Sequence, residues 1–146
     1  MGVSTAVVGK EYPATSYEVG LEKIREYANA VGQAEPVHHD RGAARAAGFR
    51  DVVAPPMFAV VYSAPALGPA ILDPEVGIDF AAMVHGGQEF VWGEPVCAGD
   101  EITTRARVRE IYQRDDKGFY VFESVSTNQH GDEVVRGTWT NIVRGV

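Results

Sequence analysis

The sequence has 146 residues, of which 45% are hydrophobic and 23% are charged, and its formal net charge is −7 at pH 7. A chain of this length is expected to form one domain over residues 1–146 and to bury roughly 70% of its unfolded surface. The acidic balance argues against a nucleic-acid partner, which requires a basic face. The single cysteine, Cys97, excludes an intramolecular disulfide framework and a cysteine-rich metal site. No secretory leader pattern opens the sequence, so we expect a cytoplasmic protein.

The first predicted helix runs from about Leu21 to Val31, where apolar residues recur at helical spacing opposite a charged face. Gly32 is its expected stop, because glycine adopts the left-handed conformation that ends many helices. The following residues 33–40 have no periodicity and contain a proline, which predicts a loop. Asp40 is then the predicted N-cap of a short helix that Gly48 ends.

The run from Pro55 to Leu72 contains no charged residue. A helix that is apolar on all sides is a buried helix. This one is too short and too rich in proline to cross a bilayer, which needs about 20 apolar residues. Pro56 suits a first helical position, whereas Pro65 and Pro69 are expected to kink or restart the helix because each removes a backbone donor.

The second half of the sequence is predicted to be mostly strand. Alternation is clearest after Glu101, where Ile102, Thr104, Ala106 and Val108 face one way, and Arg105, Arg107 and Arg109 form a solvated face. One buried helix with an antiparallel sheet around it makes the expected fold class α+β. The expected strands are 17–19, 78–84, 88–92, 101–113, 119–127 and 133–143, with hairpin turns at 115–118 and 129–132.

Only one stretch, residues 33–40, combines titratable groups with irregular backbone next to the buried helix. Three of these residues also have a purely structural interpretation. Asp40 can serve as a helix cap, Glu35 as a turn residue and His39 as a solvent-exposed side chain. The adjacent His38 and His39 would suit a metal, but no further His or Cys stands at a useful spacing, so no metal is expected.

Other motifs that carry chemistry are missing from the sequence. No phosphate-binding glycine loop, dinucleotide fingerprint or nucleophile elbow occurs, and we therefore expect no cofactor. Cys97 lies in a predicted turn without a cationic neighbour to lower its pKa, so we expect its thiol to be inert.

The segment from Tyr27 to His38 resembles the signature of MaoC-like (R)-specific enoyl hydratases and (3R)-hydroxyacyl-thioester dehydratases. In that family a helix ends in glycine and the pattern Asp-x-Asn-Pro-x-His follows. The resemblance continues through residues 44–47, 53–57 and 95–100 and covers nearly the whole chain from Tyr12 onward. Within this family, the sequence most resembles the short N-terminal-type proteins that form the small subunits of dehydratases.

This resemblance implies a hot dog fold, in which an antiparallel sheet wraps around a long buried helix. It also implies an acyl-coenzyme A or acyl-carrier-protein thioester as substrate, and a homodimer or a heterodimer with a second MaoC-like subunit. In the family an Asp and a His position and activate a water, while a backbone N–H at the start of the buried helix polarises the thioester carbonyl.

Carried over residue by residue, the family His is His38, the Asp is Gln33 and the Asn is Glu35. Gln33 cannot act as a base, although its amide can hold a water, and Glu35 is a candidate substitute for the missing carboxylate. The family glycine that donates to the thioester oxygen is Pro56, which has no N–H, so that Met57 would have to donate instead. The candidates for an acyl-binding groove, or alternatively for plain core, are Pro56, Met57, Phe58, Val61 and Tyr62.

Three functions follow from these residues. The favoured one is a fatty-acid dehydratase or hydratase subunit that is catalytically impaired and works with a motif-intact partner. The second is a self-sufficient homodimeric hydratase that uses His38 with Glu35 or Gln33. The third is an acyl-thioester-binding domain without chemistry. A thioester hydrolase on the same fold is a weaker fourth, because its acidic residue normally lies near the buried helix, which has none here.

Overall fold

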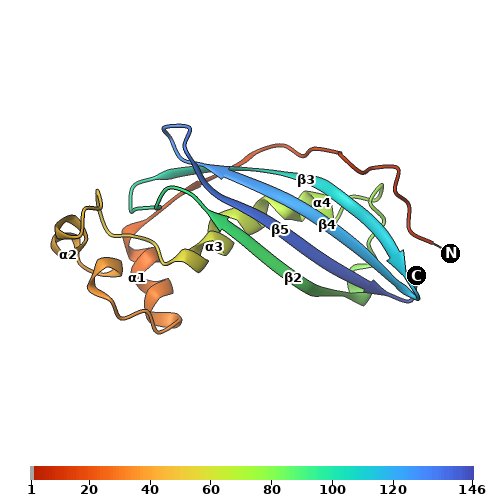
Figure 1. The fold of residues 1–146 in the computed structure, drawn as a ribbon, viewed down its shortest axis with the longest axis horizontal. Coiled ribbons are helices and arrows are strands. Elements are labelled where there is room, and N and C mark those ends of the chain that lie inside the picture. The colour runs from red at the N-terminus through yellow and green to blue at the C-terminus, as the bar shows by residue number, and fades with distance from the viewer. Residues whose placement is uncertain (1) are drawn as a thin grey trace.

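The computed structural model describes residues 2–146, in which five antiparallel strands form one sheet in the order β1-β3-β4-β5-β2. A broken helix crosses one face of this sheet, and two short helices extend beyond one end (Figure 1). This is the hot dog arrangement, and the α+β prediction is confirmed. The strands are β1 (Thr15–Glu18), β2 (Met83–Trp92), β3 (Glu101–Arg114), β4 (Lys117–Thr127) and β5 (Glu133–Arg144).

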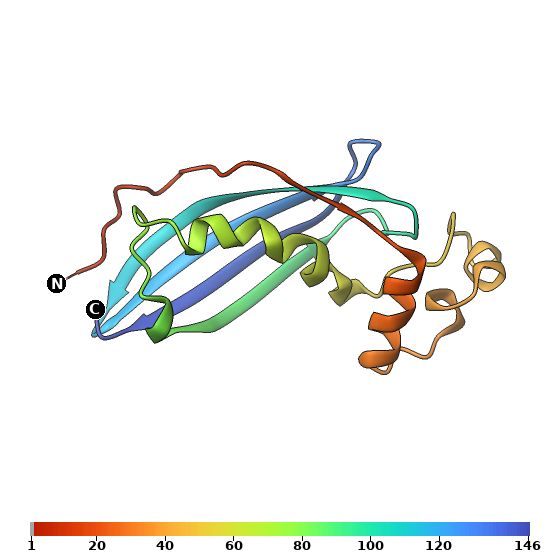
Figure 2. The same cartoon turned by 180° about the vertical axis from the view of Figure 1, so that it is seen from behind.

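The central helix is a series of short turns, as its prolines predict. Figure 2 shows it lying across one face of the sheet. Prolines occupy the first or second position of three of its four segments, where a missing N–H breaks no helical hydrogen bond. The segments are η2 (Pro56–Phe58), α3 (Ala59–Ser63), η3 (Ala64–Leu67) and α4 (Gly68–Ile71), of which the η segments are 3₁₀ turns.

This central helix separates two apolar clusters. The cluster under its first half contains Phe58, Ala59 and Tyr62, and it includes Ile24 from α1 (Leu21–Ala30). The cluster under its second half contains Leu67 and joins it to the inward side chains of β3, β4 and β5. Burial of these side chains supplies the main force that holds the helix on the sheet.

The alternation predicted for β3 holds through Val108 and then changes phase. A bulge lies at Arg109, where Val108 pairs with Phe122 but Glu110 pairs with Val121. The extra residue turns Ile111, an odd-numbered residue, toward the core. The arginine face is polar as expected: Arg107 Nε lies 3.0 Å from Glu123 Oε1, although Arg107 itself is half-buried.

Two strand boundaries differ from the sequence-based expectation. The β3–β4 turn contains only Asp115 and Asp116, not four residues, because Asp115 takes a positive φ of 55° that suits a two-residue hairpin. Residues 80–82 form a 3₁₀ turn (η4), so the strand expected at 78–84 is wrong and β2 is one long strand from Met83. An Asp79 side chain caps that turn and competes with extended backbone.

Strand β2 forms one edge of the sheet and presents apolar side chains there. Val84, Val91 and Trp92 are 43%, 60% and 49% exposed. On the same strand, the side-chain amide N and O of Gln88 are both buried, and neither has a hydrogen-bond partner among residues 2–146.

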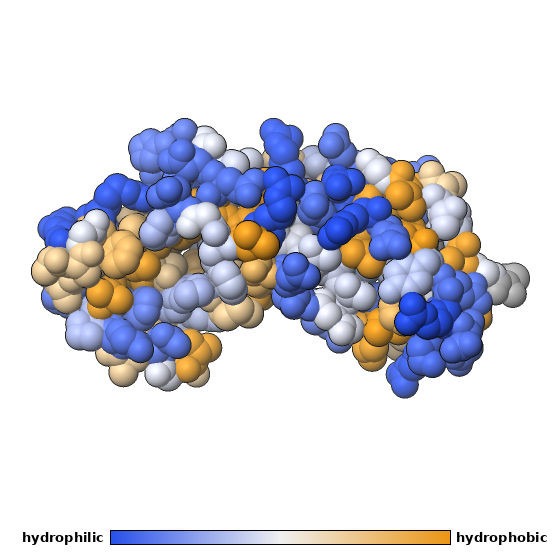
Figure 3. Space-filling view, viewed as in Figure 1, coloured by the Kyte–Doolittle hydropathy of each residue, from blue (hydrophilic) through white to orange (hydrophobic). Residues whose placement is uncertain are grey.

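Residues 21–50, which include helices α1 and α2 (Arg41–Ala46), project beyond one end of the sheet, and we call this part the overhang (Figure 1). Apolar residues gather at this end in the space-filling view of Figure 3. Gly32 has a φ of 76° and ends α1 as predicted, and the Asp40 side chain accepts a 2.7 Å bond from the Ala43 amide at the start of α2. The loop between these helices contains an unpredicted 3₁₀ turn, η1 (Pro36–His38). Within residues 2–146 no helix is both long and apolar enough to span a membrane.

The N-terminal arm runs along the free side of β3 (Figure 2). Gly9 and Tyr12 donate backbone hydrogen bonds of 2.8 and 3.0 Å to Val108 and Ala106. The Lys10 ammonium lies 2.7 Å from the Asp73 carboxylate, which also accepts a 2.6 Å bond from the Tyr12 hydroxyl. These contacts fasten the arm to the loop after the central helix.

Candidate active site

His38 is held in a fixed orientation at the end of η1. Its side chain is buried, and its Nδ1 lies 2.7 Å from the Val53 carbonyl oxygen. Because a carbonyl can only accept, Nδ1 carries the hydrogen and donates it, which leaves Nε2 of the neutral ring with a free lone pair. The Val53 amide in turn donates to the Val37 carbonyl at 3.0 Å, so the two loops that meet at His38 are tied to each other.

The His38 ring lines a hollow of about 370 Å³, which we call the His38 pocket. Its size falls within the range that small-molecule sites occupy. Apart from His38, the polar side chains in its lining belong to Tyr62, Trp92 and Glu94. The apolar lining consists of Val37, Phe49, Val53, Ala54, Pro55, Pro56, Pro95, Val96 and Val134, with Gly93 beside them.

The other two predicted catalytic residues lie outside this pocket. Gln33 lines a second hollow, of about 420 Å³, and Pro55 and Pro56 contribute to both hollows. Glu35 is exposed and lines neither hollow. The carboxylate in the lining of the His38 pocket is instead that of Glu94, an exposed residue that sequence reasoning did not single out.

The predicted groove residues divide between the two hollows and the core. Pro56 and Tyr62 line the His38 pocket, whereas Met57 is 46% exposed and lines the second hollow. Phe58 is completely buried and packs edge-on against Tyr27 with ring centroids 5.3 Å apart. Val61 is half-buried against the same cluster. Phe58 and Val61 therefore match the plain-core alternative that the sequence left open.

The neighbours of His38 have structural roles. The expectation that His39 is exposed is wrong: its ring is half-buried because Nε2 lies 2.7 Å from the Gln33 carbonyl oxygen, to which it donates. The two adjacent imidazoles are thus committed to different backbone carbonyls. Among the residues that the structure describes, no group of three or more His, Cys, Asp or Glu side chains could hold a metal ion.

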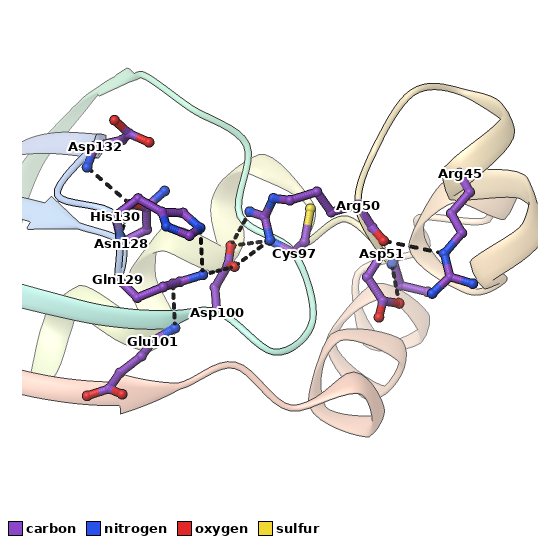
Figure 4. Close-up of polar contacts among 11 residues, drawn as sticks. Arg45, Arg50, Asp51, Cys97, Asp100, Glu101, Asn128, Gln129, His130 and Asp132 are labelled. Atoms are coloured by element: carbon purple, nitrogen blue, oxygen red, sulfur yellow. Dashed lines mark hydrogen bonds and ion pairs between the residues drawn. The ribbon is translucent and has the colours of Figure 1, made fainter.

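A buried ion pair next to the pocket was not foreseen from the sequence. Asp100 has a fully buried side chain, and Arg50 binds both of its carboxylate oxygens, at 2.8 and 3.0 Å (Figure 4). The Gln129 side-chain amide and the Cys97 backbone amide each donate a further 2.9 Å bond. Burial alone would raise the pKa of the Asp100 carboxyl, but these donors outweigh it and hold that pKa below its usual range.

The ion pair also changes the interpretation of Cys97. The sequence predicted no cationic neighbour, whereas the Arg50 guanidinium lies close enough to favour the thiolate (Figure 4). Burial has the larger effect and raises the pKa of the Cys97 thiol. Both Asp100 and Cys97 lie in the motif at residues 95–100, but Arg50 lies 50 residues from Asp100 in the sequence. The glycine-aspartate pair after a turn was the sole local sign of a buried carboxylate.

Comparisons of the chain with protein families, with known relatives and with solved structures agree with one another. Residues 6–136 match the family model described as "FAS1-like, dehydratase domain region". A UPF0336 protein of Saccharopolyspora erythraea is 41% identical over 146 residues, which cover 99% of this chain and 94% of that relative.

Two solved structures superpose closely. A MaoC-like dehydratase gives a TM-score of 0.87 at 28% identity and covers 97% of this chain, which itself spans only 43% of that longer chain. A chain of the HadBC (3R-hydroxyacyl-ACP dehydratase) complex of Mycobacterium tuberculosis gives a TM-score of 0.80 at 27% identity, covering 94% of this chain and 98% of that one.

Proposed function

Because this chain belongs to the family of FAS1-like dehydratase-region proteins, we propose that it is one subunit of a (3R)-hydroxyacyl-thioester dehydratase or enoyl hydratase. The MaoC-like resemblance of the sequence and the hot dog fold agree with this membership. Such an enzyme adds water across the double bond of an enoyl thioester, with the hydroxyl going to C3 and a proton to C2, or runs the reverse reaction.

The orientation of His38 is the observation that carries the proposal. Its Nδ1–H is fixed on the Val53 carbonyl at 2.7 Å, and its ring lines an apolar pocket that suits an acyl chain. An imidazole with a free Nε2 lone pair can take a proton from water during hydration, or return one during dehydration. Fixing the ring in advance lowers the entropic cost of reaching that geometry.

The two motif positions that accompany the family His supply no general base beside His38 in this chain. Gln33 has no basic group and lines the second hollow instead of the His38 pocket, while Glu35 is exposed and lines neither. The loss of a general base typically lowers a rate by about 10²–10⁴-fold. A second subunit with an intact Asp and His would supply the missing groups, and this chain would contribute an acyl-binding pocket and structural support.

Strand β2 is the surface we assign to that second subunit. It is a sheet edge of ten residues with Val84, Val91 and Trp92 exposed, and unpaired edges of this kind pair with other strands. The HadBC complex, one chain of which superposes on this one, contains two kinds of subunit. A homodimer through the same edge is the alternative. The acyl group would be carried on coenzyme A or on an acyl carrier protein.

The test is the hydration of crotonyl-coenzyme A by the purified chain, followed by loss of enoyl-thioester absorbance. We expect little turnover by the chain alone and at least about 10²-fold more after co-expression with a motif-intact MaoC-like subunit. Clear turnover by the chain alone that His38→Ala abolishes would instead favour the self-sufficient homodimer. No turnover in either preparation would contradict both and leave an acyl-binding domain.

A further inference from the structure

We infer that the Tyr62 hydroxyl donates a hydrogen bond to the thioester carbonyl oxygen of an acyl ligand in the His38 pocket. Tyr62 lies on α3 and is only 3% exposed, yet it lines the same pocket as His38 and Pro56. This inference rests on the proposed function and assigns to Tyr62 a polar role, in addition to apolar contact with an acyl tail.

The side chains of the pocket leave Tyr62 as the available buried donor. The Trp92 indole N–H is already used, since it donates to the Pro56 carbonyl oxygen at 2.9 Å. The Nδ1–H of His38 is used by Val53, and the Glu94 carboxylate can only accept. The Tyr62 hydroxyl, by contrast, has no hydrogen-bond partner within residues 2–146, and its oxygen is not among the fully buried unpartnered atoms, which leaves it accessible to a ligand in the pocket.

The backbone of the pocket offers few alternatives. The amides of Val53 and Ala54 donate to Val37 and Val96, at 3.0 and 2.8 Å. Those of Gly93 and Glu94 also donate to backbone carbonyls, at 2.9 and 3.1 Å. Three further lining residues are prolines, which have no N–H: Pro55, Pro56 and Pro95.

The chemistry of a thioester complements this arrangement. Its carbonyl oxygen only accepts hydrogen bonds, and negative charge develops on it when water adds to the conjugated double bond. Burial raises the pKa of the Tyr62 phenol, so the hydroxyl keeps its proton and remains a donor throughout the physiological pH range. Tyr62 would thus provide the donor that Pro56 cannot.

The experiment compares two ligands that differ in the carbonyl group alone. Butyryl-coenzyme A carries the thioester oxygen but has no double bond to hydrate, so it is bound without being turned over, and the thioether S-butyl-coenzyme A lacks that oxygen. Both are titrated into the chain, and into its complex with the motif-intact subunit, by calorimetry and by tryptophan fluorescence, to which Trp92 in the pocket lining contributes. We expect the wild type to prefer the thioester by about five-fold, the contribution of one neutral hydrogen bond.

Tyr62→Phe is expected to abolish this preference by weakening thioester binding alone. The ring that packs beside Phe58 is retained, so the fold should persist. Tyr120→Phe is the matched control, because Tyr120 is equally buried, at 2%, but lies outside the pocket. An unchanged thioester preference in Tyr62→Phe would overturn the inference and leave the proposed function standing. If the wild type binds neither ligand in either preparation, both proposals fail together.

Discussion

Asp100 is a residue whose charge is stabilised entirely by its neighbours. Its buried carboxylate accepts hydrogen bonds from Arg50, Gln129 and the Cys97 amide. If the negative charge is removed, these donors lose part of their bonding, and the Arg50 charge loses its counterion. We expect Asp100→Asn to lower the free energy of unfolding by about 3 kcal/mol at pH 7. Urea denaturation measures the difference. The control Asp116→Asn removes a carboxylate that is 71% exposed and should change stability by less than about 0.5 kcal/mol.

The same carboxylate predicts a pH dependence. Its pKa in the folded protein is lower than in the unfolded chain, so the unfolded state binds more protons as the medium becomes acidic. The stabilisation is therefore complete above the ordinary carboxyl pKa of about 4 and decreases as the pH falls through the lower folded value. The difference between wild type and Asp100→Asn should shrink from pH 7 to pH 3. A difference that grows on acidification would contradict this assignment.

Gln88 gives the opposite expectation for a buried polar group. Because neither atom of its amide has a protein partner, an apolar side chain of similar size should fit better, and Gln88→Leu is expected to raise the free energy of unfolding by about 1–2 kcal/mol. Gln129→Leu makes the same chemical change where the amide binds Asp100 and the Glu101 amide, and it should destabilise. Thermal unfolding of both variants tests whether their effects have opposite sign.

At the level of elements, Gly137 sets how closely two strands and their aromatic rings can approach. A Cβ atom at this position of β5 would lie 2.7 Å from both Ser124 Oγ and Trp139 Nε1, which are hydrogen-bonded to each other, and 3.0 Å from Phe90. Gly137→Ala is therefore expected to cost about 1–3 kcal/mol. Gly87→Ala on β2 has no neighbour nearer than 3.6 Å and serves as the control. Equal denaturation midpoints for the two variants would contradict this packing argument.

Elements whose signals are local could be predicted from the sequence, and those set by distant contacts could not. Asp40 and Gly32 mark helix ends through their own side chain and backbone, and both predictions are confirmed. The bulge at Arg109 depends on pairing with β4, about a dozen residues away, and the alternation before it carries no sign of it. Similarly, His38 could be found from its motif, whereas the unpartnered state of Tyr62 depends on which loops surround the pocket.

At the scale of the whole molecule, the N-terminal arm is fastened at one strong point. Lys10 and Tyr12 both bind the Asp73 carboxylate and lower its pKa to about 2, so the contact persists in mild acid. We expect Asp73→Ala to loosen the arm locally without unfolding the domain. Trypsin should then cleave after Lys10 several-fold faster, as measured by mass spectrometry. Glu75→Ala, which removes a more exposed partner of Lys10, should change the rate little.

The network around Asp100 also has a consequence for the order of folding. It joins three segments that are remote in sequence: the loop carrying Arg50, the turn before β3, and the β4–β5 hairpin with Gln129. The hairpins close short loops, but the Arg50 contact closes a loop of 50 residues and needs the turn and hairpin in place first. The overhang should thus dock after the transition state. In kinetic measurements Arg50→Ala is expected to accelerate unfolding while leaving the refolding rate almost unchanged, which corresponds to a φ-value near zero.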